Sequence, residues 1–264
     1  MDLESLCNEA IVLIREVGNF ISNERVKFSK ESIESKGKHN YVTYVDTKAE
    51  ELLVEGLQQI LPSSGFITEE GTASVRNEIY NWVIDPLDGT TNFIHGSPPY
   101  AISVALMEKE EVVLGVVYEI SGSECFYSYR NSGAFLNGSA IHVSKVESVS
   151  ESLIATGFPY DNFDRLEPFM RSLKHFFVHT HGVRRLGSAA TDLAYVACGR
   201  YDAFYEYNLN AWDVAAGAFV VKQAGGMAGD FSGGENYIFG REIVASNKRI
   251  FNEFQHKVGQ IMNP

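Results

Sequence analysis

Cysteine, basic residues and long apolar runs are all in short supply in this chain of 264 residues. The three cysteines stand far apart, with no Cys-x-x-Cys pair among them, at Cys7, Cys125 and Cys198. An odd number at such spacings gives no disulfide framework and is typical of proteins kept in a reducing compartment. We therefore expect a cytoplasmic protein in which Cys125 and Cys198 are core residues.

Positive charge is the second scarcity. The chain has 22 Lys and Arg against 34 Asp and Glu, a formal net charge of −12, and its basic residues form no cluster. Binding to a nucleic-acid backbone depends on clustered lysine and arginine, so no nucleic-acid partner is expected. A small phosphorylated ligand is still compatible with this charge, because bound cations can reverse the local field.

Long apolar runs are missing as well. No stretch approaches the roughly 18 apolar residues that mark a membrane-spanning helix. The first ten residues, MDLESLCNEA, carry acidic groups where a secretory signal peptide carries basic ones. We expect no membrane partner, while a 45% hydrophobic content in a chain of this length is enough to bury a large core.

Periodicity predicts helices first and then a run of strands. Apolar residues recur every three to four positions over 3–21 and over 47–60, which predicts two amphipathic helices. Thr47 and Glu50 fit a capping box at the start of the second helix. Short strands are predicted at 66–68, 82–85, 101–107, 112–119 and 125–129, followed by a hairpin with Asn137-Gly138 at its turn.

From about residue 150 strands and helices alternate. Strands are predicted near 153–156, 183–186, 202–207 and 242–246, and helices at 162–177, 188–199, 213–224 and the C-terminus. Such alternation favours layered α/β packing. We place a boundary near residue 147, which divides the chain into an N-terminal α+β half, 1–147, and a C-terminal α/β half, 148–264.

The stretch WVIDPLDGTTNF, residues 82–93, joins an apolar strand to two carboxylates. Pro86 disfavours helix at Asp85, so the strand should end there, and Asp88 could point into the same hollow. Two close carboxylates repel each other unless a cation lies between them. Oxygen ligands suit a hard ion such as Mg²⁺, to which the carbonyl of Leu87 could add. The alternative is an ordinary Asx turn at Asp88-Gly89.

The small residues after Asp88 suit a phosphate group. Gly89 permits an unusual backbone angle, and the amides of Thr90 and Thr91 can face an anion at a helix-like N-terminus. Further acids stand at the ends of predicted strands and helices, where α/β proteins gather ligand groups; they are Asp46, Glu69, Glu70 and Asp213. Taken singly, each of these is equally an ordinary turn charge or helix-start residue.

Five motifs in order resemble the inositol monophosphatase family, whose members are Mg²⁺-dependent, lithium-sensitive phosphomonoesterases. The motifs are YVTYVDTKAE, ITEEG, WVIDPLDGTTNF, RRLGSAATDLAYVACGRYDAFYE and AWDVAAGAFVVKQAGG, within residues 41–226. The resemblance implies an αβαβα layered sandwich and a homodimer. It also implies hydrolysis of myo-inositol 1-phosphate to inositol and phosphate, with two or three Mg²⁺ ions in each site.

Carried over residue by residue, the resemblance implies a complete site. The metal ligands would be Glu69, Asp85, the Leu87 carbonyl, Asp88 and Asp213. Asp46 and Thr90, with Glu69 close by, would orient and help deprotonate a water molecule that attacks phosphorus in line, and Glu70 would support the site. The phosphate and the sugar-alcohol ring would be bound by Asp88, Gly89, Thr90, Thr91, Gly187, Ser188, Ala189 and Glu206.

Three alternatives stay open. The substrate could be that of another superfamily member, such as fructose 1,6-bisphosphate, 3′-phosphoadenosine 5′-phosphate, NADP or histidinol phosphate. A phosphatase of the haloacid dehalogenase type is disfavoured, because its two aspartates lie two apart whereas Asp85 and Asp88 lie three apart. A non-catalytic binding module is disfavoured by the presence of Asp46, Glu69 and Thr90.

One departure from the family pattern lies in the loop before Asp46. Family members often carry a lysine there that helps a metal ion to bind. The segment ESKGKHNYVT offers Lys36 and Lys38 without a clear register. We therefore assign neither lysine a role.

Overall fold

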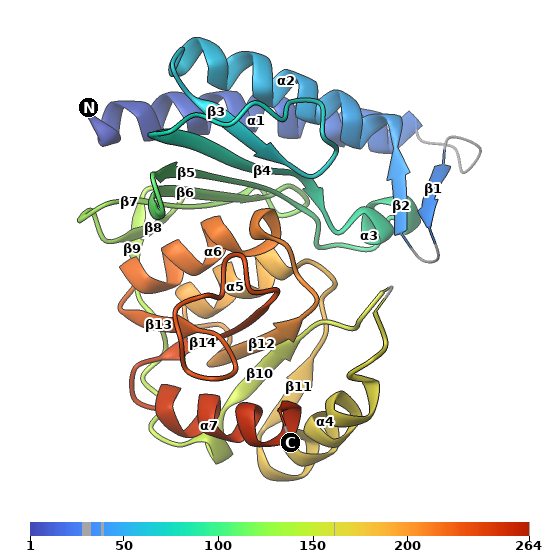
Figure 1. The fold of residues 1–264 in the computed structure, drawn as a ribbon, viewed down its shortest axis with the longest axis vertical. Coiled ribbons are helices and arrows are strands. Elements are labelled where there is room, and N and C mark those ends of the chain that lie inside the picture. The colour runs from blue at the N-terminus through green and yellow to red at the C-terminus, as the bar shows by residue number, and fades with distance from the viewer. Residues whose placement is uncertain (28–32, 38–39, 161, 264) are drawn as a thin grey trace.

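Layers of helix and sheet alternate in this structure, a computed structural model that describes residues 1–27, 33–37, 40–160 and 162–263. Figure 1 shows the order helix, sheet, helix, sheet, helix from top to bottom. This order confirms the predicted αβαβα sandwich. No helix in the described ranges is long and apolar enough to cross a membrane.

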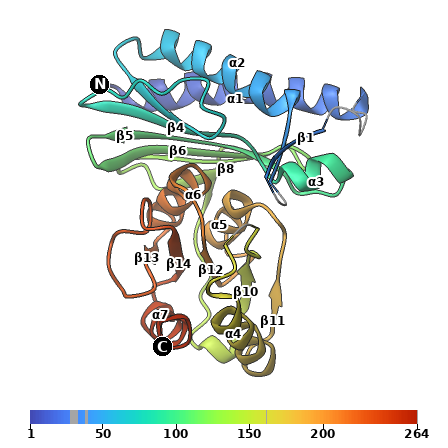
Figure 2. The same cartoon turned by 45° about the vertical axis from the view of Figure 1, so that its right-hand side comes forward.

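Two long helices, α1 (Leu3–Lys27) and α2 (Tyr44–Ile60), form the first layer and cover one face of the first sheet (Figure 2). Their apolar stripes point inward, so that Ile14 and Leu53 are fully buried. A short antiparallel pair, β1 (Ile33–Gly37) and β2 (Asn40–Thr43), lies between them in the chain. Lys36 lies in β1 and Lys38 lies outside the described residues.

The first sheet has seven strands in the order β3-β4-β5-β6-β7-β8-β9, all antiparallel to their neighbours except for the parallel pair β3–β4. The strands are β3 (Gly65–Thr68), β4 (Tyr80–Asp88), β5 (Ala101–Glu108), β6 (Glu111–Glu119), β7 (Glu124–Tyr129), β8 (Ala134–Leu136) and β9 (Ser139–Ile141). The predicted hairpin is confirmed between β8 and β9. Its turn residues have the left-handed φ angles of a type I′ turn, 48° at Asn137 and 85° at Gly138.

The second sheet has the order β11-β10-β12-β14-β13. Strand β10 is parallel to β11 and β12, whereas β14 is antiparallel to β12 and β13. The strands are β10 (Leu153–Thr156), β11 (Gly182–Arg184), β12 (Ala203–Tyr207), β13 (Gly226–Gly229) and β14 (Glu242–Asn247). Helices α4 (Leu166–His179) and α7 (Phe251–Met262) form the last layer, beyond this sheet (Figure 1).

The middle layer consists of α5 (Ala189–Ala197) and α6 (Ala211–Gln223), which lie between the two sheets. Because α6 is covered from both sides, it is apolar almost all round instead of amphipathic. The contact with the first sheet is close: a Cβ atom added at Gly115 of β6 would lie 2.8 Å from the carbonyl oxygen of Ala216. The remaining short helices are α3 (Thr90–His95) and η2 (Val149–Glu151).

Helix α2 begins at Tyr44, earlier than predicted. Its capping box consists of Thr43 and Asp46, because the N–H of Thr43 donates to Asp46 Oδ2 at 2.9 Å. The predicted box of Thr47 and Glu50 is therefore wrong. Thr43 is already in an extended conformation, with φ −120° and ψ 162°, and so it caps the helix one turn before the predicted position.

Strand β4 continues through Pro86 to Asp88, so the predicted strand end at Asp85 is also wrong. On one side, β3 stops at Thr68, which pairs with Ile84. On the other side, the pairing of β4 with β5 changes register between Asp85 and Asp88. Proline lacks an N–H group, but it is tolerated at such an irregularity because no neighbouring strand pairs with this position.

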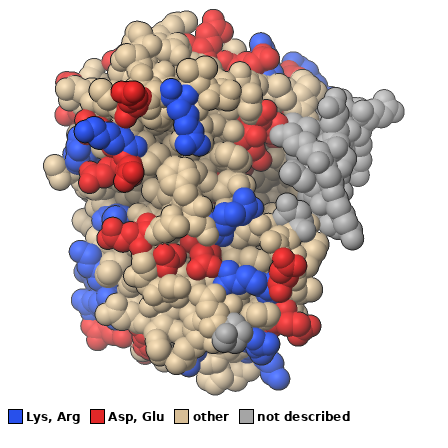
Figure 3. All heavy atoms as spheres, in the orientation of Figure 1, with Lys and Arg blue, Asp and Glu red and all other residues tan. Residues whose placement is uncertain are grey.

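Three features of the fold were not predicted, namely β13, the β1–β2 pair and the single turn η2; all are short. The strands of the first sheet come from 65–141 and those of the second from 153–247. Helices α5 and α6 nevertheless share one core with residues of the first sheet. The boundary near residue 147 therefore stays a prediction. On the face shown in Figure 3, acidic and basic side chains are intermixed, without a broad basic patch.

Candidate active site

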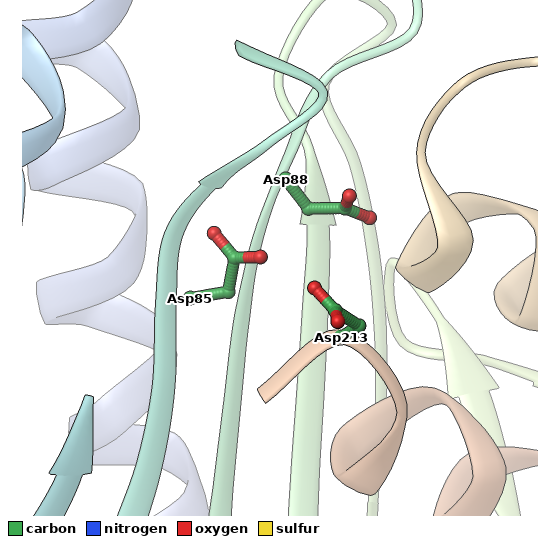
Figure 4. Close-up of side chains that lie close together, drawn as sticks. All are labelled: Asp85, Asp88 and Asp213. Atoms are coloured by element: carbon green, nitrogen blue, oxygen red, sulfur yellow. The ribbon is translucent and has the colours of Figure 1, made fainter. Parts of the chain in front are cut away.

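Three aspartates from two elements meet at one point (Figure 4). Asp85 and Asp88 lie at the end of β4, on either side of its register shift, and Asp213 lies in the first turn of α6. One carboxylate oxygen from each lies within 4.8 Å of the others. The N–H of Asn210 donates to Asp213 Oδ2 at 2.6 Å and orients this side chain. The helix begins at Ala211, slightly before its predicted start at Asp213.

Burial and mutual repulsion oppose the charged form of these aspartates. Burial raises the pKa of Asp85 well above its usual range, and the charges of Glu69 and Asp88 raise it further. Burial also raises the pKa of Asp88 to about 6 and, together with the charge of Asp88, that of Asp213 to about 7. A cation between them would remove this repulsion, and an all-oxygen ligand set suits a hard ion such as Mg²⁺. The residues present therefore fit a divalent metal.

Glu69 adds a fourth carboxylate from the neighbouring strand. It follows β3 directly, and its N–H donates to the carbonyl of Ile84 in β4 at 3.2 Å. Burial, followed by the charge of Asp213, raises its pKa well above the usual range. The charge of Glu69 in turn raises the pKa of Asp85, so the two carboxylates repel each other unless a proton or a cation lies between them. Glu70 follows in the same turn, and its charge also acts on Glu69.

Asp46 and Thr90 form the predicted pair, although they come from separate elements. The hydroxyl of Thr90 donates to Asp46 Oδ1 at 2.8 Å and also lies 3.1 Å from the carbonyl oxygen of Leu87. Asp46 Oδ2 accepts from both the N–H and the hydroxyl of Thr43, at 2.9 and 2.5 Å. Asp46 is 1% exposed, and burial raises its pKa despite these hydrogen bonds. One oxygen of Asp46 therefore caps α2, while the other accepts a hydrogen bond from Thr90.

The turn after Asp88 has the backbone geometry expected of Gly89. Its φ is +94°, and a Cβ atom there would lie 3.1 Å from the carbonyl oxygen of Gly187 and 3.2 Å from that of Pro99. A side chain would therefore be strained as well as crowded. Gly89, Thr90 and Thr91 line one cavity together with Glu69, Asp85, Asp88 and Asp213, the four acids that we call the acidic cluster.

The start of α5 holds Asp88 from the opposite side. The hydroxyl of Ser188 and the N–H of Ala190 both donate to Asp88 Oδ2 at 2.7 Å. Ser188 is also the N-cap of α5 and accepts from the N–H of Thr191. Negative charge is stabilised at the N-terminus of a helix. Gly187, Ser188 and Ala189, predicted to contact the substrate ring, thus line the cavity, and Ser188 also binds Asp88.

A statistical model of the Inositol monophosphatase family matches residues 2–262. This chain belongs to the inositol monophosphatase family. It is 40% identical over 254 residues to a protein of Pseudomonas aeruginosa named Nus factor SuhB, a match that covers 94% of each chain. It is 36% identical over 251 residues to an inositol-1-monophosphatase of Mesorhizobium japonicum, covering 95% of this chain and 94% of that protein.

The solved structure of an IMPase from Thermotoga maritima aligns with a TM-score of 0.89 and 35% identity, covering 100% of this chain and 99% of that one. The predicted family and fold are therefore confirmed, and membership of the inositol monophosphatase family supports a phosphatase activity. The relatives carry two kinds of name, a phosphatase and a Nus factor. Their names therefore leave the substrate of this chain open.

Within this family fold, Glu206 lies near the end of β12 and is only 5% exposed, so it is not a solvated surface charge. Its carboxyl group packs directly on Gly157, where an added Cβ atom would lie 1.9–2.1 Å from the carboxyl atoms. Burial, then repulsion from Asp213 and Asp88, raises its pKa well above the usual range. Glu206 lines the cavity together with the acidic cluster.

The structure adds lining residues that the sequence interpretation missed. The cavity has a volume of about 160 Å³, and its unpredicted lining residues are Gly157, Tyr160, Asn208, Leu209, Asn210 and Arg241. The phenol oxygen of Tyr160 accepts from Arg185 Nη2 at 2.8 Å. The sequence carries a possible signal for only one of these residues, Gly157, a glycine that directly follows the predicted strand 153–156.

Proposed function

We propose that this chain is a Mg²⁺-dependent phosphomonoesterase that hydrolyses myo-inositol 1-phosphate to inositol and phosphate. The observation that carries the proposal is the convergence of the acidic cluster and the Asp46–Thr90 pair on one cavity, beside the buried Glu206. These groups come from segments far apart in the chain. A charged, buried cluster of this kind is costly to a fold that does not use it.

The metal would be held by Glu69, Asp85, Asp88, Asp213 and the carbonyl of Leu87, and the resemblance to the family implies two or three ions in each site. When bound, it supplies positive charge to the phosphoryl oxygens and lowers the pKa of a coordinated water. The lining residues Gly89, Thr90 and Thr91 would bind the phosphate through backbone amides and hydroxyls. The homodimer, the cytoplasmic location and the lithium sensitivity stay predictions.

The Asp46–Thr90 pair would orient the attacking water and take its proton. Because the hydroxyl of Thr90 donates to Asp46 Oδ1, its oxygen lone pairs face away and can accept a hydrogen bond from water. Burial raises the pKa of Asp46, which makes it a better proton acceptor than an exposed aspartate. The proton would move from water to Thr90 Oγ1 and from Thr90 to Asp46 Oδ1.

The substrate is tested by measuring phosphate release from inositol 1-phosphate, fructose 1,6-bisphosphate, 3′-phosphoadenosine 5′-phosphate, NADP and histidinol phosphate. We expect the highest kcat/KM with inositol 1-phosphate, no release after chelation of divalent metal, and recovery with Mg²⁺. A different best substrate would replace inositol 1-phosphate while keeping the chemistry. Release from none of the five would favour the non-catalytic binding module, and full activity in metal-free buffer would overturn the metal-dependent chemistry.

Glu206 should accept hydrogen bonds from the hydroxyl groups of the substrate ring. Glu206→Ala removes up to two hydrogen-bond acceptors, so we expect a higher KM for inositol 1-phosphate and a loss of about 1.5–3 kcal/mol of transition-state binding. Hydrolysis of 4-nitrophenyl phosphate, which has no ring hydroxyls, should change little. The measurement is kcat/KM for both substrates.

Two further variants sharpen this test. Gly157→Ala should displace the Glu206 carboxyl group without removing it, and so reproduce the same selectivity between the two substrates. Glu235→Ala, at an exposed position, serves as the control and should leave both substrates unaffected. An equal loss for both substrates would mean that Glu206 supports the acidic cluster and does not contact the ring.

A further inference from the structure

Glu50 is a buried acid for which the proposed chemistry has no role. It lies in α2, is 0% exposed and is not among the described residues that line the cavity. In the predicted capping box its carboxylate would have faced the first turn of its own helix. In the structure it faces a different segment, the turn that follows β3. A buried carboxylate is costly unless it is hydrogen-bonded, so its partners indicate its role.

Both oxygens of Glu50 accept hydrogen bonds from this turn. Glu50 Oε2 accepts from the N–H of Glu70 at 2.8 Å. Glu50 Oε1 accepts from the N–H of Thr72 at 2.8 Å and from its hydroxyl at 2.7 Å. Hydrogen bonds to an ionised acceptor are stronger than neutral ones, so these three bonds clamp the turn onto α2. Gly71, between Glu70 and Thr72, has a left-handed φ of +73°, which the tight turn requires.

The clamp acts on the peptide bonds that flank Glu69. The N–H of Glu69 donates to Ile84 of β4, which fixes the peptide plane before this residue. The N–H of Glu70 belongs to the peptide plane after it, and that plane is fixed by Glu50. Two fixed planes set both φ and ψ of Glu69, and with them the direction of its Cα–Cβ bond. Glu50 therefore helps to fix the direction in which the Glu69 side chain leaves the backbone.

The same helix face carries Asp46. Residues four apart lie one above the other on a helix, so Asp46 and Glu50 face the same side of α2. Asp46 reaches Thr90, and Glu50 reaches the turn with Glu69. We propose that Glu50 is a positioning residue that aligns Glu69 with Asp85 and with the Asp46–Thr90 pair, using α2 as a common rigid support. This inference rests on the proposed function, since it assigns Glu69 to the metal site.

Glu50→Gln tests this role with little change in volume. The amide keeps one acceptor oxygen but turns an NH₂ group toward an N–H donor, so part of the clamp is lost. Residues that orient metal ligands typically contribute about 10–100-fold to metal affinity or activity, and we expect a loss of that size in both. Metal affinity is measured directly by titrating the metal-free protein with Mn²⁺ in a calorimeter, and kcat by phosphate release.

The matched control is Glu51→Gln, the next residue of α2. Glu51 is exposed and pairs with Lys48 at 2.8 Å, so its substitution removes the same charge without touching the turn. Both affinity and kcat should stay at wild-type values in this control. If Glu50→Gln lowers the melting temperature but matches Glu51→Gln in Mn²⁺ affinity and kcat, Glu50 is only a structural tie and the inference is overturned.

A milder variant decides the case if Glu50→Gln does not fold. Thr72→Val removes the hydroxyl donor to Glu50 Oε1 and keeps the N–H donor. We expect weaker Mn²⁺ binding in this variant too, with a smaller change, whereas wild-type affinity would overturn the inference. The calorimetric measurement needs no substrate, so it tests Glu50 even if the wild-type protein hydrolyses none of the five phosphate esters and the proposed function fails.

Discussion

Asp213→Asn should abolish metal-dependent phosphate release while the protein stays folded. Asn keeps an oxygen that can accept the hydrogen bond from the N–H of Asn210, so α6 keeps its capping interaction. It removes one negative charge from the cluster with Asp85 and Asp88, and with it the attraction for a divalent cation. We expect kcat to fall to background and Mn²⁺ affinity to fall with it, measured by phosphate release and by calorimetry.

In Asp213→Asn, activity should fall, but the stability of the metal-free protein should stay the same or rise. Burial and the charge of Asp88 raise the folded-state pKa of Asp213 from 3.8 to about 7, so the stability of the metal-free protein falls as the pH rises between these values and stays lower above about 7. Without metal, Asp213→Asn should therefore melt at the same temperature as the wild-type protein or higher. Asp164→Asn, at an exposed position, is the control and should change neither activity nor melting. Wild-type activity in Asp213→Asn would remove Asp213 from the metal site.

Thr90→Ala should lower kcat by about 10²–10⁴-fold, the usual range for the loss of general acid–base catalysis. The variant loses the hydroxyl that joins Asp46 Oδ1 to the cavity but keeps the carboxylates of the acidic cluster. Mn²⁺ affinity should consequently change far less than kcat. The measurements are kcat from phosphate release at saturating Mg²⁺ and Mn²⁺ affinity from calorimetry.

Thr90→Ser is the matched control, because it retains a hydroxyl and should restore most of the lost kcat. A near-normal kcat in Thr90→Ala would leave Asp46 with only its helix-capping role toward Thr43, which the structure also shows. Isolation of a protein phosphorylated on Asp85 or Asp88 would instead favour a covalent mechanism of the haloacid dehalogenase type. The two results would exclude the proposed proton path for different reasons.

Local chemistry was enough to predict most of the elements of the fold. Short apolar runs bounded by charged or Gly/Ser turns predicted β5, β6 and β7, because a strand that is buried on both faces carries apolar residues at successive positions. Asn137-Gly138 predicted its hairpin, because few residues adopt left-handed φ angles without strain. Ser188 predicted the start of α5 because a short hydroxyl side chain can cap a helix. In each case the deciding interaction lies within a few residues.

The predicted site residues depended on motif resemblance for their grouping. Composition and periodicity placed Asp46, Glu69, Asp85 and Asp213 at the ends of helices and strands, where each was equally an ordinary capping or turn residue. The structure places Glu69, Asp85 and Asp213 in the wall of one cavity and joins Asp46 to this wall through Thr90. Their roles in catalysis stay predictions until the variants are measured.

What the sequence by itself determined about this protein is therefore its family, its layered fold and the residue types available for a metal and a phosphate. Only the tertiary structure decided that β4 passes through Pro86, that Glu50 clamps the turn after β3, and that Glu206 packs against Gly157. The reason is physical. These contacts join segments far apart in the chain, and a side chain's partner across such a distance is set by how whole layers pack together, which no local propensity records.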